Sequence, residues 1–421
     1  MNVHATPKLT SAEEALIEGF QTRKGTLVGS PDVAAKRDEA AGVLKSGLPT
    51  RRIEAWHYTD LRRLLATVPA DGGKGDAAAV EPLIEGSTVL AVLDGKATGT
   101  QVPQGVRLEK VADRLMSGAL ATDLAPVHAD DTVGAINTAF VTDGYVLEIE
   151  EGADIAAPIE LQNIHSGGQV HSRFAVKVGK GAKVTIVERQ TGSADALVSS
   201  ISNLDVADDA HVNWLIIQDQ PKEATHLGQI RGRFGAGSNV TMFLMNTGAK
   251  LVRQEIHVVA AGEESQFRLR GVNLLGGDTH CDVTMVLDHA APHTTSTEII
   301  RNVITDRAHG VFQGQIRVDR LAQKTDAKMA CNTLLLSDDG EFSTKPELEI
   351  FADDVACGHG ATVTEIDHDH LFYLMARGVE EKLARGLLVK AFLREVIEEL
   401  DNEAIVEALE ARLEAWFVAH G

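Results

Sequence analysis

A thiol and an imidazole two positions apart, at Cys357 and His359, are the side chains in this sequence best suited to chemistry. In an extended strand, residues i and i+2 point to the same face, so this pair can bind one metal ion or one sulfur species together. Gly358 and Gly360 let the backbone approach whatever binds there. The pair supplies only two ligands, whereas a closed zinc site needs four. A buried, inert cysteine beside a solvent-facing histidine is therefore the alternative interpretation.

A second group of possible ligands lies upstream, where His280, Cys281, Asp282, His289 and His293 fall within fourteen residues. Ligands on a repeated β structure can converge from neighbouring coils, so a metal site is one interpretation of this segment. Isolated polar residues at strand ends are the other interpretation, and we favour it.

Charge and composition restrict the class of protein. Forty basic residues against 61 acidic residues give a net charge of -21, which opposes binding to nucleic acid or anionic membranes. No apolar run approaches the roughly 18 residues that a membrane span needs. Three cysteines, Cys281, Cys331 and Cys357, lie far apart, which fits a reducing compartment, and Cys331 is expected to be a buried strand residue. We therefore expect a cytoplasmic protein without a membrane or nucleic-acid partner.

The hydrophobic pattern predicts a mainly β protein with flanking helices. Residues 1-130 are expected to form a mainly helical N-terminal region, in which Trp56 and Tyr58 serve as packing anchors. Residues 131-363 show short alternating strands. Residues 364-421 return to a helical period and form the expected C-terminal helical domain.

The strand-rich region contains an internal repeat. Small residues that follow a turn recur at steps of 29, 28, 28 and 27 residues, at Ala153, Ala182, Ala210, Ser238 and Ser265. The residues before them are Gly152, Gly181, Asp209, Gly237 and Glu264. A fixed period of strand, turn and strand indicates a solenoid in which each unit covers its neighbour's apolar face. We predict a β-helix, a stacked β-solenoid, as the core; an antiparallel sandwich is the alternative.

The C-terminal helices carry apolar stripes in an acidic surround. From Glu365 to Gly421 there are 13 acidic and 6 basic residues, a net charge of -7. The default expectation is that the stripes close on each other as a small bundle. The other possibility is that part of them binds a partner protein.

The residues around Cys357 belong to a long motif that resembles the SufB/SufD family of iron-sulfur cluster assembly proteins. The motif reads Lys-Pro-x-Leu-Glu-Ile-x-Ala-Asp-Asp-Val-x-Cys-x-His-Gly-Ala-Thr from Lys345 to Thr362, and Leu371–Leu374 and Arg377–Val379 follow it. Leu48–Arg51 and Trp56–Leu61 are similar to the N-terminal signature of the SufD branch. Gly358 stands where SufB-like sequences tend to carry an acidic residue, which also favours that branch.

The resemblance implies partners. In this family SufB and SufD pair through their cores, and each C-terminal helical domain docks a SufC ATPase. We therefore expect SufB and SufC as partners, and a homodimer when the chain is isolated. The residues expected to bind the ATPase subunit are Phe372, Tyr373, Arg377, Leu387, Leu388 and Phe392.

The resemblance also implies a site and a role. His359 is the first candidate to bind iron or the nascent cluster, and Cys357 is the second. The cofactor is then a transient iron-sulfur cluster shared with SufB, on a chain that acts as a scaffold and not as an enzyme. No Gly-x-x-x-x-Gly-Lys-Ser/Thr sequence is present, so we expect no nucleotide to bind this chain.

Two other classes of function remain as alternatives. A β-helix enzyme acting on carbohydrate would use paired carboxylates on one solenoid face, but aromatic residues for sugar stacking are scarce. A Cys-His hydrolase would use Cys357, but spacing of i and i+2 on one strand leaves no third group to orient the histidine.

Overall fold

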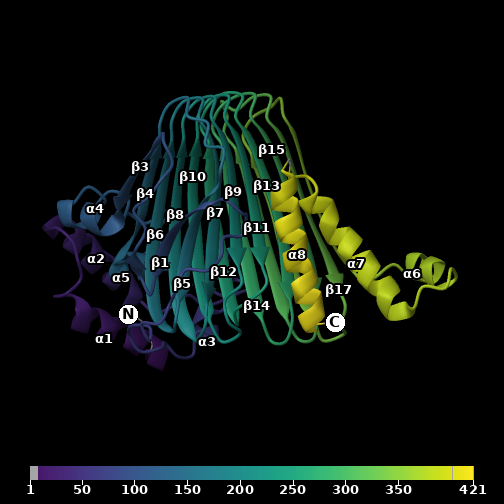
Figure 1. Cartoon of the computed structure of the whole chain (residues 1–421), viewed down its shortest axis with the longest axis horizontal. Helices are drawn as coiled ribbons and strands as arrows, with labels where there is room; N and C mark the ends of the chain where they lie inside the picture. Colours follow the sequence, from purple (N-terminus) through teal and green to yellow (C-terminus); the bar gives the residue numbers. More distant parts are fainter. Residues whose placement is uncertain (1–7, 401, 421) are drawn as a thin grey trace, which may run out of the picture.

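The computed structural model describes residues 8–400 and 402–420. Two facing sheets of stacked strands form a β-solenoid, with helices at its N-terminal end and against one of its faces (Figure 1). Successive coils pair in parallel, for example β10 with β12 and β17 with β19, so the predicted β-helix core with flanking helices is confirmed. An antiparallel sandwich is excluded by this pairing.

From β4 onward, odd-numbered strands lie in one sheet and even-numbered strands in the other, while β2 and β3 lie at the N-terminal edges of the two sheets. The ten-stranded sheet runs in the order β19-β17-β15-β13-β11-β9-β7-β5-β1-β2, and its strands are β1 (Thr88–Leu93), β2 (Lys96–Ala97), β5 (Ile159–His165), β7 (Lys183–Gly192), β9 (His211–Gln218), β11 (Asn239–Asn246), β13 (Gln266–Leu275), β15 (Thr295–Ile304), β17 (Asp326–Leu335) and β19 (Ala356–Thr364). The nine-stranded sheet runs in the order β18-β16-β14-β12-β10-β8-β6-β4-β3, and its strands are β3 (Val106–Lys110), β4 (Asp143–Ile149), β6 (Gly168–Val178), β8 (Ala196–Val206), β10 (Thr225–Phe234), β12 (Leu251–Ala260), β14 (His280–His289), β16 (His309–Val318) and β18 (Glu341–Ile350). Apolar side chains from the inward faces of both sheets form one long interior.

The internal repeat marks one corner of the solenoid, where the chain turns with a left-handed residue. The residues before the repeated small positions all have positive φ, between 59° and 69°, at Gly152, Gly181, Asp209, Gly237 and Glu264. Each small residue then tucks under the next coil, and its carbonyl accepts a backbone hydrogen bond of 2.8 to 3.0 Å from that coil. The same turn recurs at His293 and Lys324, with φ of 57° and 64°. These two positions were not part of the repeat recognised in the sequence.

The N-terminal helices cover the outward face of the nine-stranded sheet. They are α1 (Ser11–Arg23), α2 (Pro31–Leu44), η1 (Glu54–Trp56), α3 (Leu61–Leu64), α4 (Val111–Ser117) and α5 (Thr132–Phe140). Their apolar side chains pack on Leu197, Leu227 and Leu251 of that sheet. Trp56 is fully buried, with the Arg253 guanidinium 4.3 Å from its ring centroid, so it is the predicted anchor.

Tyr58 is less buried than Trp56, so it contributes less to packing than the sequence predicts. It is half-buried and lies edge-on to His57, with ring centroids 4.9 Å apart. The strands β1 and β3 also lie within residues 1-130, and they extend the two sheets by pairing with β5 and β4.

The C-terminal helices do not form the expected small bundle. They are α6 (His368–Met375), α7 (Glu381–Ile397) and α8 (Glu403–His420). The apolar stripes of α7 and α8 pack on outward side chains of the ten-stranded sheet, such as Phe243, Met245 and Val272. The bundle interpretation was wrong because the sheet offers an apolar outer face that the helices cover. In contrast, α6 projects beyond the solenoid (Figure 1).

None of the helices in the described part of the chain combines the length and the apolar character that a bilayer crossing requires.

The buried histidines predict how stability depends on pH. Burial lowers the pKa of His171 to about 3 and that of four others to about 4, namely His165, His226, His280 and His289. Between about pH 4 and 6.5 the unfolded chain binds protons at these residues that the folded chain does not bind, so stability falls as pH falls. Burial of Glu298 raises its pKa to about 8, and burial also raises the pKa of Glu188 and of Asp288, so these carboxyls act in the opposite direction.

We therefore expect the thermal unfolding temperature to fall steadily from pH 7 to pH 5, as measured by scanning calorimetry. The exposed His368 provides a control, because His368→Gln should leave the pH profile unchanged. A constant unfolding temperature over this range would contradict the assignment of neutral, buried histidines.

Candidate functional site

The solenoid is open at its last coil. The strands β18 and β19 stand at the ends of their sheets, and each has a ladder partner on one side only among the described residues. Their inward side chains lie over the interior with no further coil above them; Phe342 and Leu348 are half-buried, whereas Ile350 and Val363 are exposed. An uncovered edge of this kind is a template for pairing with another chain.

Cys357 and His359 lie on this last coil and face inward. In the register of β17 and β19, Cys357 stands beside Ala327 and His359 beside Met329. Both partners are buried in the solenoid interior. The pair therefore shares one face of its strand, as the spacing predicts, and this face looks onto the open end of the interior.

The two side chains differ in their surroundings. Cys357 is half-buried and packs against the interior cluster, and its thiol is free. Burial raises the pKa of the Cys357 thiol, and the nearby carboxylates of Asp326 and Glu298 raise it further, against a hydrogen bond from the Ala327 backbone. His359 is exposed to solvent. At neutral pH the site therefore presents a protonated thiol on the inside and an accessible imidazole beside it.

A buried acidic residue lies two strands below His359 in the same row, and the sequence pattern did not indicate it. Glu298 on β15 points inward and is completely buried. It stands beside Met329, which in turn stands beside His359. The available signal is an acidic residue in the alternating run Ser296, Glu298, Ile300, but the sequence alone does not tell which side of that strand is the interior.

The segment from His280 to His293 does not form a metal site. Cys281 and His289 point into the solenoid interior, whereas Asp282 points outward and pairs with Arg253. His280 also points outward, where its Nε2 lies 2.9 Å from the Thr59 hydroxyl. His293 occupies the left-handed turn of the repeat.

Neither this segment nor any other described part of the chain holds three or more His, Cys, Asp or Glu side chains arranged for a metal ion. The metal interpretation of residues 280–293 is therefore wrong, because strand alternation sends neighbouring residues to opposite faces.

The residues expected to bind an ATPase subunit fall into two groups. Phe372 and Tyr373 on α6 are 72% and 55% exposed, and the Arg377 guanidinium lies 3.5 Å from the Tyr373 ring centroid. Leu387 on α7 is also exposed. In contrast, Leu388 and Phe392 are half-buried against the ten-stranded sheet, so they support α7 on the solenoid.

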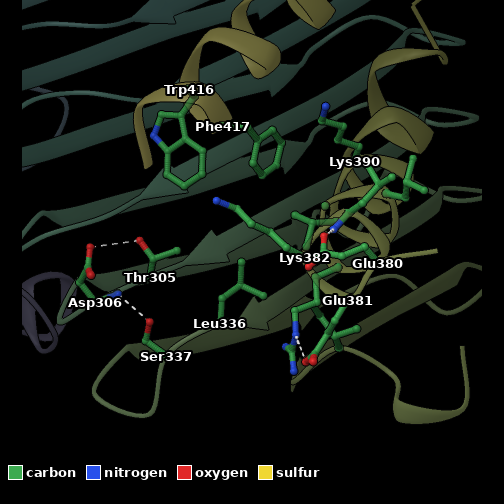
Figure 2. Close-up of a pocket in the computed structure, with 16 residues that line it drawn as sticks. Thr305, Asp306, Leu336, Ser337, Glu380, Glu381, Lys382, Lys390, Trp416 and Phe417 are labelled. Atoms are coloured by element: carbon green, nitrogen blue, oxygen red, sulfur yellow. Dashed lines mark hydrogen bonds and ion pairs between the residues drawn. The ribbon is translucent and has the colours of Figure 1, made fainter. Parts of the chain in front are cut away.

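A cavity of about 850 Å³ opens beside the exposed part of α7, between this helix, α8 and the turns at 305–306 and 336–337 (Figure 2). Its apolar wall is formed by Leu336, Trp416 and Phe417. Lys390 and Arg385 line it as well, and they are paired with Glu414 and Glu381. The cavity therefore joins an apolar wall to a rim of paired charges.

Known proteins resemble this chain along most of its length. Residues 161–392 match the family model described as the SUF system FeS cluster assembly, SufBD core domain. The chain is 26% identical to the iron-sulfur cluster assembly protein SufD of Escherichia coli over 88% of this chain and 90% of that protein. It is 28% identical to the iron-sulfur cluster assembly SufBD family protein slr0076 of Synechocystis, over 92% and 90% of the two chains. The protein ABCI7, chloroplastic, of Arabidopsis thaliana is 27% identical over 88% and 83%. The chain thus belongs to the SufBD family of iron-sulfur cluster assembly proteins.

Proposed function

We propose that this chain is a scaffold subunit that pairs with SufB through its open solenoid end and helps to assemble a nascent iron-sulfur cluster there. The observation that carries the proposal is the position of Cys357 and His359, which face the interior from the last, uncovered coil. A SufD protein is among its relatives, which supports a role in the same machinery.

Pairing through the open end follows from the physics of the uncovered coil. Free backbone groups along β18 and β19, together with inward apolar side chains such as Ile350 and Val363, favour a partner that continues the sheets. SufB is the proposed partner in the complex, and a second copy of this chain takes its place when the chain is isolated.

The chemistry of the pair suits a shared site. Imidazole is a good ligand for iron, and thiolate binds both iron and cluster sulfur. Two ligands do not complete an iron-sulfur site, so the partner supplies the others and the cluster is transient on this chain. We propose a cytoplasmic scaffold that is not itself an enzyme, while the SufC ATPase hydrolyses nucleotide.

The proposed ATPase contact is the exposed side of α6 and α7. Phe372, Tyr373 and Leu387 present apolar surface, and Arg377 stacks on Tyr373 at its edge. Exposed aromatic residues next to an arginine are typical anchors of a protein interface. The neighbouring cavity provides a recess for a partner side chain.

One prediction from this proposal concerns His359. In the assembled complex, His359→Ala should lower cluster formation about tenfold or more, because it removes a ligand while leaving the solenoid unchanged. The measurement is the rise of iron-sulfur absorption during anaerobic reconstitution. His211→Ala, which changes an exposed histidine on β9 away from the last coil, is the control.

Unchanged assembly by the His359→Ala complex would remove this site assignment. A stable, stoichiometric cluster on the isolated wild-type chain would contradict the shared site, because the proposal requires ligands from the partner.

Another prediction from this proposal concerns α6. The double change Phe372→Ala and Tyr373→Ala should weaken binding of the ATPase subunit about tenfold or more, since it removes two exposed anchors without opening a core. Calorimetric titration of the purified subunits measures the affinity. Met116→Ala is the matched control, because Met116 is 58% exposed on α4. Equal affinities for the double variant and the control would show that the ATPase docks elsewhere.

A further inference from the structure

A compact surface loop runs from Pro49 to Arg62, and its two ends meet. The backbone N–H of Arg62 donates a hydrogen bond of 3.1 Å to the Pro49 carbonyl, and internal backbone hydrogen bonds of 2.9 to 3.1 Å hold the turns between them. Loops closed in this way are Ω-loops, and they frequently carry function. The proposed function gives this loop no role.

Buried contacts hold the loop on the outer face of the nine-stranded sheet. The Trp56 ring lies against the Arg253 guanidinium, which also donates a hydrogen bond of 2.9 Å to the Ala55 carbonyl. Thr59 is fully buried, and its hydroxyl donates to the Asp282 carboxylate. These contacts fix the loop backbone, so the side chains on its outer surface start from a defined position. A prearranged surface of this kind lowers the entropy cost of binding a partner.

Three arginines on this loop or directly after it are free of anionic partners. Arg51, Arg52 and Arg63 are exposed, and none of them forms an ion pair with another described residue. Elsewhere on the surface an arginine finds a carboxylate, for example Arg307 beside Asp278. Because the ends of the loop meet, the three arginines form one positive surface on a chain whose net charge is -21.

The carboxylates close to the loop are engaged by other groups. Glu54 pairs with Lys345 of β18. Glu13 pairs with Arg62 at 3.1 Å, and Asp60 caps the N-terminus of α3. The described part of the chain therefore leaves the three guanidinium groups without a counter-charge, and all their donors are available to a ligand.

Two aromatic rings lie between the arginines in the sequence. His57 is exposed and Tyr58 is half-buried, with their ring centroids 4.9 Å apart and nearly perpendicular. Arginine and tyrosine are enriched among the residues that dominate the binding energy of protein interfaces. The loop thus offers both charge and ring surface on a fixed backbone.

The distribution of charge selects the class of partner. A guanidinium group binds a carboxylate through two parallel hydrogen bonds, so Asp and Glu side chains are suitable ligands. Nucleic acid or an anionic membrane extends far beyond three side chains, and it would meet the negative charge of the rest of the chain. A short acidic segment of a protein avoids that repulsion.

We propose that the outer surface of this loop is a docking site for a short acidic segment of a partner protein. Carboxylates of that segment bind Arg51, Arg52 and Arg63, and its remaining atoms pack on His57 and Tyr58. The loop lies on the outer face of the nine-stranded sheet, whereas the open-end pair faces inward from the ten-stranded sheet. The proposal therefore does not depend on the proposed function.

The test uses the full chain at low salt, with fluorescein-labelled hexaglutamate as the probe and fluorescence anisotropy as the measure of affinity. The loop variant combines Arg51→Gln with Arg52→Gln, which removes two cations and leaves the buried anchors intact. The matched control combines Lys177→Gln with Arg233→Gln, two exposed cations on β6 and β10 of the same sheet. A labelled hexathymidylate represents nucleic acid.

We expect the loop variant to bind hexaglutamate about tenfold or more weakly than the wild type, and the control variant to stay within about twofold of it. Added salt should weaken wild-type binding, because the contact is ionic. Arg51→Lys combined with Arg52→Lys should give an intermediate affinity, since lysine keeps the charge but loses the two parallel hydrogen bonds. All these variants change exposed side chains, so each should keep the wild-type unfolding temperature.

A wild-type chain that does not bind hexaglutamate would overturn the proposal, as would equal affinities for the loop variant and the control variant. Tighter binding of hexathymidylate than of hexaglutamate would identify a nucleic-acid site and would equally overturn it. None of these outcomes affects the proposed function, which depends on cluster formation by the His359→Ala complex.

Discussion

Parallel stacking of the coils in one register is the constraint on which the rest of this molecule depends. Inside the solenoid, Asn246, Asn273 and Asn302 lie one above another, with amide hydrogen bonds of 2.7 Å between successive members. A slip of one residue would turn every side chain of a strand to the opposite face, so the ladder and the apolar interior hold the same register together. The stacking also determines which coil is last, and that coil carries Cys357 and His359.

The solenoid could be predicted because its corner leaves a trace in the sequence. A left-handed residue followed by a small buried residue is required once in each coil, and glycine or aspartate meets the first requirement at low cost. The repeat was not recognised beyond Glu264, because His293 and Lys324 take the left-handed position there in place of glycine or aspartate. The same histidine, seen without its turn, contributed to the incorrect metal interpretation of its segment.

The hydrophobic pattern of a single helix or strand could not predict which other element covers its apolar face. The period of α7 and α8 shows that each helix has an apolar stripe, but the partner of that stripe is a sheet built from residues far away in the sequence. Glu298 was missed for the same reason, since strand alternation defines two faces without telling which one is inside. The pair Cys357 and His359 was found because its two members are close in sequence and therefore share a face whatever the fold around them.

The open end has a consequence for when the site is ordered. In an array held together by contacts between neighbours, an end coil has half the contacts of an internal coil, so it is the first to fray. A second chain that continues the sheets supplies the missing half. Under the proposed function, docking of the second chain and ordering of β19 are a single cooperative event, so Cys357 and His359 are held in a fixed arrangement only in the assembled pair.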